Sequence, residues 1–210
     1  MRVNDLPGCQ LCPRLAAHLK TVKRRYPEYH CAPVSAFGAV DASLLVIGLA
    51  PGLHGANASG RPFTGDASGD LLFASLHRFG FASQAHSSGR DDGMQLIDCR
   101  ITNAVKCLPP KNAPAADEAR NCSRYLQAEI EALPIGGVLL SLGGVAHRAV
   151  AHTLGLRQSD YPFARLTRYK LDHDRYWFST YHPSRYNLNT GRVSVESFAR
   201  VFSRIREVLP

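Results

Sequence analysis

The sequence lacks the long apolar stretches of a membrane protein. No uninterrupted apolar run approaches the roughly 20 residues that cross a bilayer. The opening residues MRVNDLPGCQLCPRL contain no apolar signal core, which argues against secretion. No repeat, low-complexity tract or long linker divides the chain, and a hydrophobic fraction of 45% is too high for disorder. We therefore expect one domain over residues 1–210, in a cytoplasmic enzyme or binding protein with no membrane partner.

Acidic residues are fewer than basic residues. Asp and Glu together number 17 and Lys and Arg number 25, which gives a formal net charge of +8. The basic surplus lies in residues 1–31 and 143–210, whereas residues 32–142 are slightly acidic. Basic ends around a near-neutral middle are typical of a surface that binds a polyanion such as nucleic acid. The alternative interpretation is a compositional bias toward Arg that has no binding role.

The cysteines have the spacing of metal ligands. A disulfide framework is not expected for six cysteines in a chain without a signal peptide. Cys9 and Cys12 form a C-x2-C pair, which lets two thiolates face one metal centre. Cys107 and Cys122, with 14 residues between them, would complete a site of four thiolates. Zinc and iron–sulfur clusters both use such a set. Cys99 has no partner at this spacing and is predicted to be a core residue.

Predicted strands and helices alternate along the sequence. Short apolar runs predict four buried strands, at residues 44–49, 101–105, 137–142 and 177–181. Apolar residues at helical spacing predict four helices, at residues 70–81, 116–133, 145–154 and 193–209. This alternation is typical of an α/β fold, and we expect a three-layer α/β/α sandwich with a central, mainly parallel four-stranded sheet. Functional loops in such folds follow the carboxyl ends of the strands.

A glycine-rich loop follows the first predicted strand. Residues 48–69 read GLAPGLHGANASGRPFTGDASG, a composition that lets the backbone turn sharply and approach a ligand closely. Neither the dinucleotide fingerprint nor the P-loop is present in it. Asp66 falls just before the next helix, and its position favours an N-cap role. Phe63 lies among Gly, Pro and Thr and is hard to explain as a core residue. We expect its ring to stack on a base.

Two further polar side chains lie at predicted strand ends. Asn103 follows the second strand inside an apolar run, where a buried amide must satisfy both its donor and its acceptor. Its amide can form hydrogen bonds with the Watson–Crick edge of a nucleobase. The alternative interpretation is that the amide forms a hydrogen bond with the backbone. His182 ends the fourth strand and is followed by Pro and Ser, as in a catalytic loop. A donor there stabilises negative charge on a leaving group. His54 is a secondary candidate.

Together these segments resemble the uracil-DNA glycosylase superfamily, and specifically its iron–sulfur family 5. The resemblance rests on CQLCPRL from residue 9, the loop at residues 48–69, TNAVKCLPP from residue 102 with the later Cys122, and HPSRYN from residue 182. The cysteine pattern is shared with family 4, whereas the form of the first loop is typical of family 5. One departure bears on substrate range: residues 57–61 read NASGR, where family 5 loops usually read NRTGR.

The resemblance implies a monofunctional DNA glycosylase of base-excision repair. Such an enzyme flips uracil, and other deaminated or modified bases, out of DNA and hydrolyses the N-glycosidic bond, which leaves an abasic site. His182 would then donate to the departing base, and Asp66 would stabilise the sugar cation or orient water. Asn103 would bind the edge of the base, Phe63 would stack on its face, and Asn187 would help to fix the extruded nucleotide. In family 5 the turn after Gly-Leu-Ala-Pro lacks the polar water-activating residue of other families, and here the apolar Gly52 and Leu53 follow Pro51, which is consistent with that feature.

The resemblance also implies further contacts and a cofactor. Four more substrate-binding positions follow from it: Gly48, Ala50, Pro51 and Gly52. Two positions are assigned to DNA binding: Ser184 and Arg185. The resemblance assigns a structural [4Fe–4S] cluster to four cysteines: Cys9, Cys12, Cys107 and Cys122. The expected partner is damaged DNA, double-stranded and also single-stranded, and the expected protein is a monomer associated with the nucleoid.

Three alternative functions stay open at this point. A uracil-specific family 4 enzyme shares the cysteines. A non-catalytic iron–sulfur protein that binds nucleic acid would explain the cysteines and the charge, although it leaves His182 and Phe63 without a role. A zinc-containing hydrolase of small nucleotides would use the same four thiolates. Iron content, hydrolysis of uracil in DNA and the range of bases removed would distinguish these alternatives.

Overall fold

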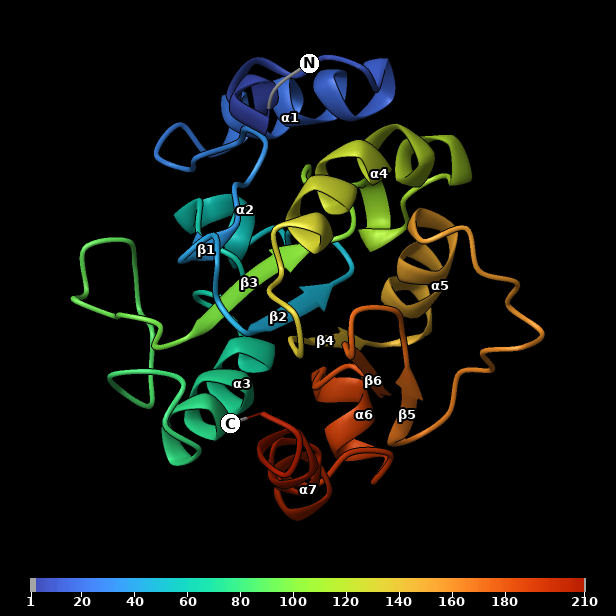
Figure 1. Ribbon diagram of the computed structural model, residues 1–210. Coiled ribbons are helices and arrows are strands. Elements are labelled where there is room, and N and C mark those ends of the chain that lie inside the picture. The colour runs from blue at the N-terminus through green and yellow to red at the C-terminus, as the bar shows by residue number, and fades with distance from the viewer. Residues whose placement is uncertain (1–2, 210) are drawn as a thin grey trace.

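A central sheet organises the computed structural model, which describes residues 3–209 (Figure 1). Within these residues the sheet has six strands in the order β1-β3-β2-β4-β6-β5. The strands are β1 (Phe37–Gly38), β2 (Leu44–Gly48), β3 (Cys99–Asn103), β4 (Val138–Leu142), β5 (Thr167–Lys170) and β6 (Tyr176–Thr180). The expectation of four strands was wrong in number. The four predicted strands are confirmed as the parallel centre, and the added β1 and β5 are antiparallel edges.

Helices cover both faces of the sheet. They are α1 (Pro13–Arg25), α2 (Ala56–Ser59), α3 (Ala67–Arg78), α4 (Ala116–Glu131), α5 (Gly144–Thr153), α6 (Arg185–Asn189) and α7 (Val195–Arg206), with 3-10 helices η1 (Val3–Gly8) and η2 (Pro110–Asn112). The four predicted helices correspond to α3, α4, α5 and α7, whereas α1, α2 and α6 were not predicted. No helix among residues 3–209 is both long and apolar enough to cross a membrane.

The strands form because their residues are buried on both faces, as in parallel sheets covered by helices. All five residues of β2 and of β4 are buried. Alternate residues of β2 point to opposite faces: Leu44 and Val46 pack with α3 and α7, whereas Leu45 and Ile47 pack with α4 and α5. The predicted three-layer α/β/α sandwich is therefore confirmed. Each large apolar side chain so buried contributes about 1.5–3 kcal/mol.

The helix α1 packs on a third, smaller apolar cluster above the end of β3. Its buried residues Leu15, Leu19 and Val22 lie on one helical face, against Val105 and Leu108 from the segment that follows β3. Proline at the first helical position and the spacing of these apolar residues are both helix signals. The helix therefore ties the N-terminal segment to the loop after β3, and both segments carry predicted cysteine ligands.

The carboxyl ends of the parallel strands meet at one edge of the sheet. Gly48, the last residue of β2, is paired in register with Asn103, the last residue of β3. The neighbouring β4 and β6 end in register at Leu142 and Thr180. The glycine-rich loop, the cysteine-bearing loop and the His182 loop therefore all leave from this edge, as expected for functional loops of an open α/β sheet.

Candidate active site

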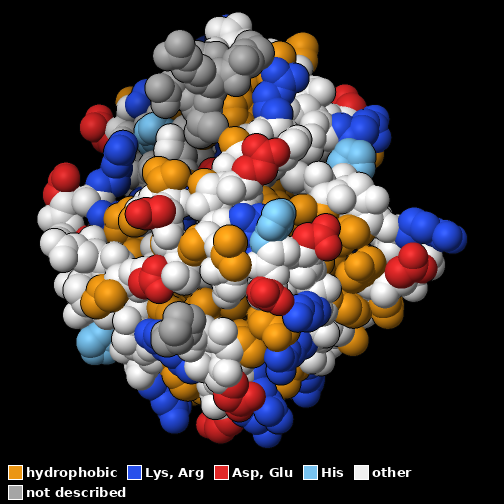
Figure 2. Space-filling view, viewed as in Figure 1, with side chains coloured by type: hydrophobic (Ala, Val, Ile, Leu, Met, Phe, Trp, Pro, Cys, Tyr) orange, Lys and Arg blue, Asp and Glu red, His pale blue; other side chains and the backbone are white. Residues whose placement is uncertain are grey.

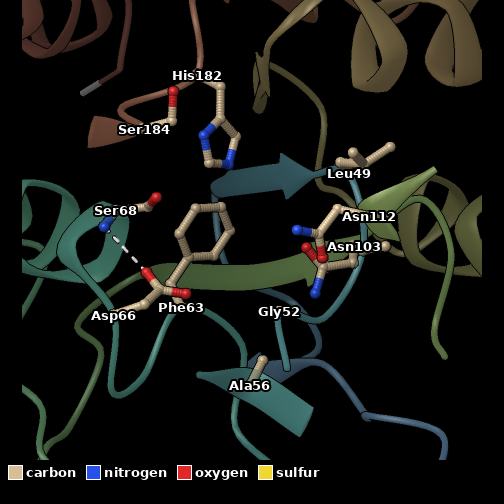
Figure 3. Close-up of a pocket in the computed structure, with 11 residues that line it drawn as sticks. Leu49, Gly52, Ala56, Phe63, Asp66, Ser68, Asn103, Asn112, His182 and Ser184 are labelled. Atoms are coloured by element: carbon tan, nitrogen blue, oxygen red, sulfur yellow. Dashed lines mark hydrogen bonds between the residues drawn. The ribbon is translucent and has the colours of Figure 1, made fainter. Parts of the chain in front are cut away.

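A cavity of about 290 Å³ lies at the carboxyl edge of the sheet (Figure 3). Its lining comes from the loop after β2, the end of β3, the loop after the cysteine segment and the loop after β6. The lining residues are Leu49, Ala50, Gly52, Ala56, Phe63, Asp66, Ser68, Asn103, Asn112, His182 and Ser184. The predicted catalytic pair and the two predicted base-contacting side chains are thus brought together, although the outermost two, Phe63 and His182, lie 119 positions apart in the sequence.

Phe63 lies in the cavity and in the apolar core at the same time. The residue is 6% exposed and packs with the cluster that β2, α3 and α7 form. The expectation that Phe63 is not a core residue was therefore wrong, because the glycine-rich loop folds back over the sheet. Its backbone has a φ of 56°, a left-handed conformation that is rare for a bulky residue. One face of its ring meets His182 in the cavity.

Asp66 both caps a helix and faces the cavity. Its Oδ1 accepts hydrogen bonds from the backbone N–H groups of Ser68 (2.9 Å) and Gly69 (3.0 Å), so the predicted N-cap of α3 is confirmed. Its Oδ2 faces the opposite side of the loop, where a Cβ added at Gly55 would lie 2.4 Å from it. The carboxylate is thus fixed through one oxygen and presents the other to the site (Figure 3).

The amide of Asn103 is buried without a backbone partner. The residue is 3% exposed, and its side chain makes no hydrogen bond with any of residues 3–209. The alternative interpretation of a backbone-bonded Asn is therefore not supported. A buried amide that keeps its donor and acceptor free is suited to bind a ligand with a matching edge.

His182 follows β6 and is held by its own loop. The side chain of Asn187 donates to the His182 carbonyl oxygen at 2.8 Å, and Ser184 caps the short helix α6. Burial lowers the pKa of His182, and the charge of the Asp66 carboxylate opposes part of that shift. The imidazole is therefore neutral at neutral pH, with one nitrogen available as a donor and the other as an acceptor.

Four predicted site residues do not line the cavity. Gly48 lies beneath it at the end of β2, and Pro51 is buried in the loop. Asn187 contacts the His182 backbone, and Arg185 is exposed at the start of α6. Their contacts with substrate or DNA stay predictions. Four lining residues were not predicted from the sequence, because they lack a distinguishing local pattern: Leu49, Ala56, Ser68 and Asn112.

The four predicted cysteine ligands line a second, separate cavity beneath α1. Cys9 and Cys12 come from the turn before α1, Cys107 from the loop after β3, and Cys122 from α4. All four are free thiols, and the side chain of Asn121 donates to Cys12 Sγ at 3.6 Å. Cys99 lies elsewhere, fully buried in the sheet, and its prediction as a core residue is confirmed.

The thiols of this cysteine site influence one another electrostatically. Burial and the neighbouring thiols raise the pKa of Cys107 to about 12, and burial also raises the pKa of Cys122 and of Cys12. Deprotonation of these thiols would therefore require a nearby positive charge to stabilise the thiolates. Among residues 3–209, no group of three or more His, Cys, Asp or Glu side chains is arranged so that it could hold a metal ion.

The sequence has relatives that cover nearly all of its length. A profile of the "Uracil DNA glycosylase superfamily" matches residues 35–206. A "Type-5 uracil-DNA glycosylase" of Thermus thermophilus is 41% identical over 98% of this chain and 96% of its own length. The chain belongs to the type-5 family of the uracil-DNA glycosylase superfamily. The predicted resemblance is therefore confirmed.

Further relatives support the same family. A "Type-5 uracil-DNA glycosylase" of Pyrobaculum aerophilum is 42% identical over 96% of this chain and 89% of its own length. A "Type-4 uracil-DNA glycosylase" of Sulfurisphaera tokodaii is 28% identical over 83% of this chain and 75% of its own length. The similarity to type-5 relatives is thus the greater of the two, in agreement with the form of the glycine-rich loop.

Proposed function

We propose that this protein is a monofunctional uracil-DNA glycosylase of base-excision repair. The observation that carries the proposal is the cavity at the sheet edge, which combines an aromatic ring, a free buried amide, an imidazole and a carboxylate. This set matches the needs of N-glycosidic cleavage of a flipped base, since the departing base becomes anionic and the sugar cationic. The type-5 relatives are named for this activity.

His182 and Asp66 would carry the chemistry from two sides of the cavity. A neutral imidazole can donate an N–H to the base oxygen on which negative charge develops, and removal of such a donor costs about 2.7–4 kcal/mol. Asp66 would use Oδ2 to stabilise the sugar cation or to orient the attacking water, because its Oδ1 is occupied by backbone N–H groups of α3. The helix cap thus fixes the position of the catalytic carboxylate.

Phe63 and Asn103 would hold the flipped base between them. The base would stack on the exposed part of the Phe63 ring, and the free amide of Asn103 would bind its edge. Uracil fits this amide because it offers an adjacent carbonyl oxygen and N–H. Hypoxanthine and xanthine present a similar edge, so we include deaminated purines in the proposed substrate range.

A [4Fe–4S] cluster held by four cysteines is part of the proposal: Cys9, Cys12, Cys107 and Cys122. Each thiolate binds a different iron of such a cluster, so the ligands need not converge on one atom as in a zinc site. The four free thiols on one cavity fit this donor set. When bound, the cluster would supply a structural link between the start of α1, the loop after β3 and α4.

DNA would approach over α1 and the rim of the active-site cavity. Tyr26 and Tyr29 stack with ring centroids 4.7 Å apart, and the Tyr29 hydroxyl forms a hydrogen bond of 2.9 Å with His54 Nδ1. The last turn of α1 beside them carries Lys23, Arg24 and Arg25. Aromatic rings beside cations suit a nucleic-acid strand. On the face drawn in Figure 2, leaving aside the grey residues, basic side chains are interspersed with acidic ones.

The proposed enzyme would act as a monomer, because one molecule of the protein is enough to act on one flipped base.

Alkali cleavage of an end-labelled duplex with a single uracil tests the proposed function. The iron-loaded protein should leave the strand intact until alkali is added and then give one cut at the uracil position. Asp66→Ala and His182→Ala should each lose most of this product, while Asp41→Ala, at the opposite end of β2, should not. No alkali-labile site with uracil, hypoxanthine or xanthine, despite DNA binding, would contradict the proposal and favour a binding protein.

A further inference from the structure

Exposed arginines gather next to the loop that carries His182. Arg165 comes just before β5, Arg185 begins α6, and Arg192 follows α6. None of the three forms an ion pair with a carboxylate of residues 3–209. Residues 161–171 and 175–195 contain no Asp or Glu, so the positive charge of this surface is not offset by neighbours in the sequence. Arg185 is a predicted DNA contact, whereas Arg165 and Arg192 were not predicted to have a role.

Aromatic rings and a backbone carbonyl, instead of carboxylates, hold Arg165 and Arg192. The Arg165 guanidinium lies over the Tyr181 ring, 5.9 Å from its centroid, and Arg165 Nη2 donates to the Arg192 carbonyl oxygen at 2.7 Å. The Arg192 guanidinium lies over the Tyr186 ring, 5.6 Å from its centroid. A ring attracts a cation but leaves its charge unneutralised. Because a guanidinium has five N–H donors, both arginines keep donors for a ligand.

This arrangement suits a phosphate as the ligand. The hydrogen bond from the Arg165 side chain to the Arg192 backbone joins two segments that each carry a cation, and a bound anion relieves the repulsion between them. The planar fork of an arginine pairs with two oxygens of one phosphate. Since the rings and the carbonyl already restrict the guanidinium groups, less conformational entropy is lost when a phosphate binds.

The order of the strands places this surface and α1 on opposite flanks of the active-site cavity. The helix α1 packs above the end of β3, whereas Tyr181 and α6 follow β6, and Figure 1 shows α1 at the top of the molecule and α6 near the bottom. The strands β2 and β4 lie between β3 and β6, so the ends of β3 and β6 are about 14 Å apart at the usual strand spacing. One DNA strand rises about 3.4 Å per nucleotide, so about four steps would reach across the cavity from flank to flank.

We propose that Arg165 and Arg192 bind backbone phosphates of the DNA strand that carries the flipped base, on the flank of the cavity opposite α1. The proposal rests on the proposed glycosylase function and gives its DNA substrate a second contact surface. Phosphate contacts fix the position of a strand and carry no sequence information. The two arginines therefore add affinity for damaged and undamaged DNA alike, and the cavity alone selects the base.

The salt dependence of DNA binding tests this surface without turnover. Fluorescence anisotropy would measure the affinity for a duplex with a single 2′-fluoro-2′-deoxyuridine, whose glycosidic bond resists cleavage, over a series of salt concentrations. Each phosphate contact contributes about 0.9 to the slope of log affinity against log salt concentration. Arg165→Gln and Arg192→Gln should each reduce the slope by about one and weaken binding at low salt about three- to tenfold. An undamaged duplex should lose affinity by the same factor.

Arg78→Gln is the matched control. Arg78 is also exposed and also lies over an aromatic ring, 5.6 Å from the centroid of Phe79. It ends α3, whereas Asp66 caps the start of that helix, so about 18 Å of helix separates Arg78 from the cavity. This variant should keep the wild-type slope. An unchanged slope in both Arg165→Gln and Arg192→Gln, or an equal reduction in Arg78→Gln, would overturn the proposal.

Shortened duplexes locate the contact along the strand. Two duplexes would each keep a single base pair on one side of the fluorinated nucleotide and a full helical turn on the other. The loss of affinity in Arg165→Gln should disappear on one of them, which lacks the phosphate, and persist on the other. An equal loss on both would contradict a contact on one flank. Failure of the wild-type protein to release uracil, with the salt slopes as expected, would refute the glycosylase function and leave this surface as a DNA contact.

Discussion

The imidazole of His182 lies over the ring of Phe63, with ring centroids 5.7 Å apart and ring planes 23° from parallel. One ring comes from the loop after β6 and the other from the loop after β2. The residue proposed to donate to the base is therefore positioned by the residue proposed to stack on it. A change that moves the Phe63 ring should disturb His182 as well.

The substitution Gly48→Ala tests whether the position of His182 depends on the position of the Phe63 ring. A Cβ at Gly48 would lie 2.7 Å from the Phe63 ring and 2.4 Å from Asn103 Oδ1, so both side chains must move. We expect uracil release to fall at least about tenfold, since small displacements of catalytic groups are costly. The protein should still fold, with a loss of about 1–3 kcal/mol from overpacking.

The control for this variant is Gly89→Ala, because a Cβ at Gly89 has no atom within 4 Å. Its activity and unfolding free energy should match those of the wild type. Single-turnover kinetics and urea denaturation measure the two effects. Wild-type kinetics in Gly48→Ala would show that the positions of Phe63 and Asn103 do not matter for catalysis.

The sequence predicts the strands in which every residue is buried. The strand β4 is buried at every position and appears as an apolar run, whereas β5 is half-exposed and reads Thr-Arg-Tyr-Lys. An edge strand of this kind gains its pairing from β6 and carries little apolar signal. The helix α1 was not predicted, although Leu15, Leu19 and Val22 at helical spacing and a proline at the first helical position are helix signals.

The candidate site was predictable only where its residues follow strands. Asn103 and His182 follow parallel strands, so strand order alone brings them to the same edge. Asn112 lies 9 positions beyond Asn103 in the sequence, and only a left-handed turn at residues 111–112 and its contacts with α1 carry it back to the cavity. Such a return depends on tertiary contacts, which no local pattern encodes.

Asp66 should raise the pKa of His182 against the effect of burial. Burial lowers this pKa, and the Asp66 carboxylate opposes part of the shift. Asp66→Asn should therefore lower the pKa of His182 further, while Asn still caps α3. NMR titration of the imidazole measures the shift, and Asp41→Asn at the far end of β2 is the control. An unchanged or higher pKa in Asp66→Asn would show that the two groups do not interact.

The same shift sets a pH dependence of stability. Since the folded pKa of His182 lies below that of an unfolded histidine, the unfolded chain binds the proton first as the pH falls. The contribution of His182 is therefore complete above about pH 6.5 and is lost as the pH falls from there toward the folded pKa. Urea denaturation of wild type and His182→Gln across this range should show the difference, with wild type the more acid-sensitive of the two.

A buried ion pair holds the glycine-rich loop to residues 83–95. Arg61 Nη1 lies 2.7 Å from Asp92 Oδ1, and each side chain is only 8% exposed. Asp92 also accepts hydrogen bonds from the Ser87 hydroxyl and the Met94 N–H, each at 2.9 Å. Burial by itself would raise the pKa of Asp92. The hydrogen bonds from Arg61, Met94 and Ser87 outweigh this effect and hold the pKa of Asp92 well below its usual range.

Asp92→Asn should cost about 3–5 kcal/mol, because it leaves the Arg61 charge buried without its partner. The adjacent exposed Asp91→Asn should leave stability unchanged. Because the pKa of Asp92 is depressed, its contribution is present above about pH 4 and is lost as the pH falls below it. Denaturation at pH 7 and pH 3 measures both effects. Equal acid sensitivity of wild type and Asp92→Asn would contradict this account.

A second buried ion pair lies between the sheet and α4. Lys106 is fully buried, and its Nζ contacts the Glu129 carboxylate at 2.8 and 3.0 Å and also the Thr102 hydroxyl. Lys106→Met should cost about 3–5 kcal/mol, because a carboxylate then stays buried alone. Lys106→Met with Glu129→Leu should recover most of this loss, as apolar replacements of buried pairs often do.

A double-mutant cycle measures the coupling of these two residues. Lys170→Met is the control, because the Lys170–Asp174 pair has a similar separation, 2.9 Å, but both side chains are largely exposed. That variant should show no measurable loss of stability, since water screens surface pairs. Additive effects of the two single changes at Lys106 and Glu129 would show that the buried pair has no coupling.

The proposed cluster predicts different effects for two cysteines of similar burial. Cys107 lines the cysteine site and is 8% exposed, whereas Cys99 is fully buried in the sheet and makes no contribution to that site. Cys107→Ala should lose the visible absorbance, most of the bound iron and much of the stability, because a structural metal centre contributes folding free energy. Cys99→Ala should keep the iron, and its stability should fall only by the cost of creating a small cavity.

Iron analysis, visible spectroscopy and thermal denaturation of both variants make the comparison. Full iron content with unchanged absorbance in Cys107→Ala would exclude Cys107 as a ligand.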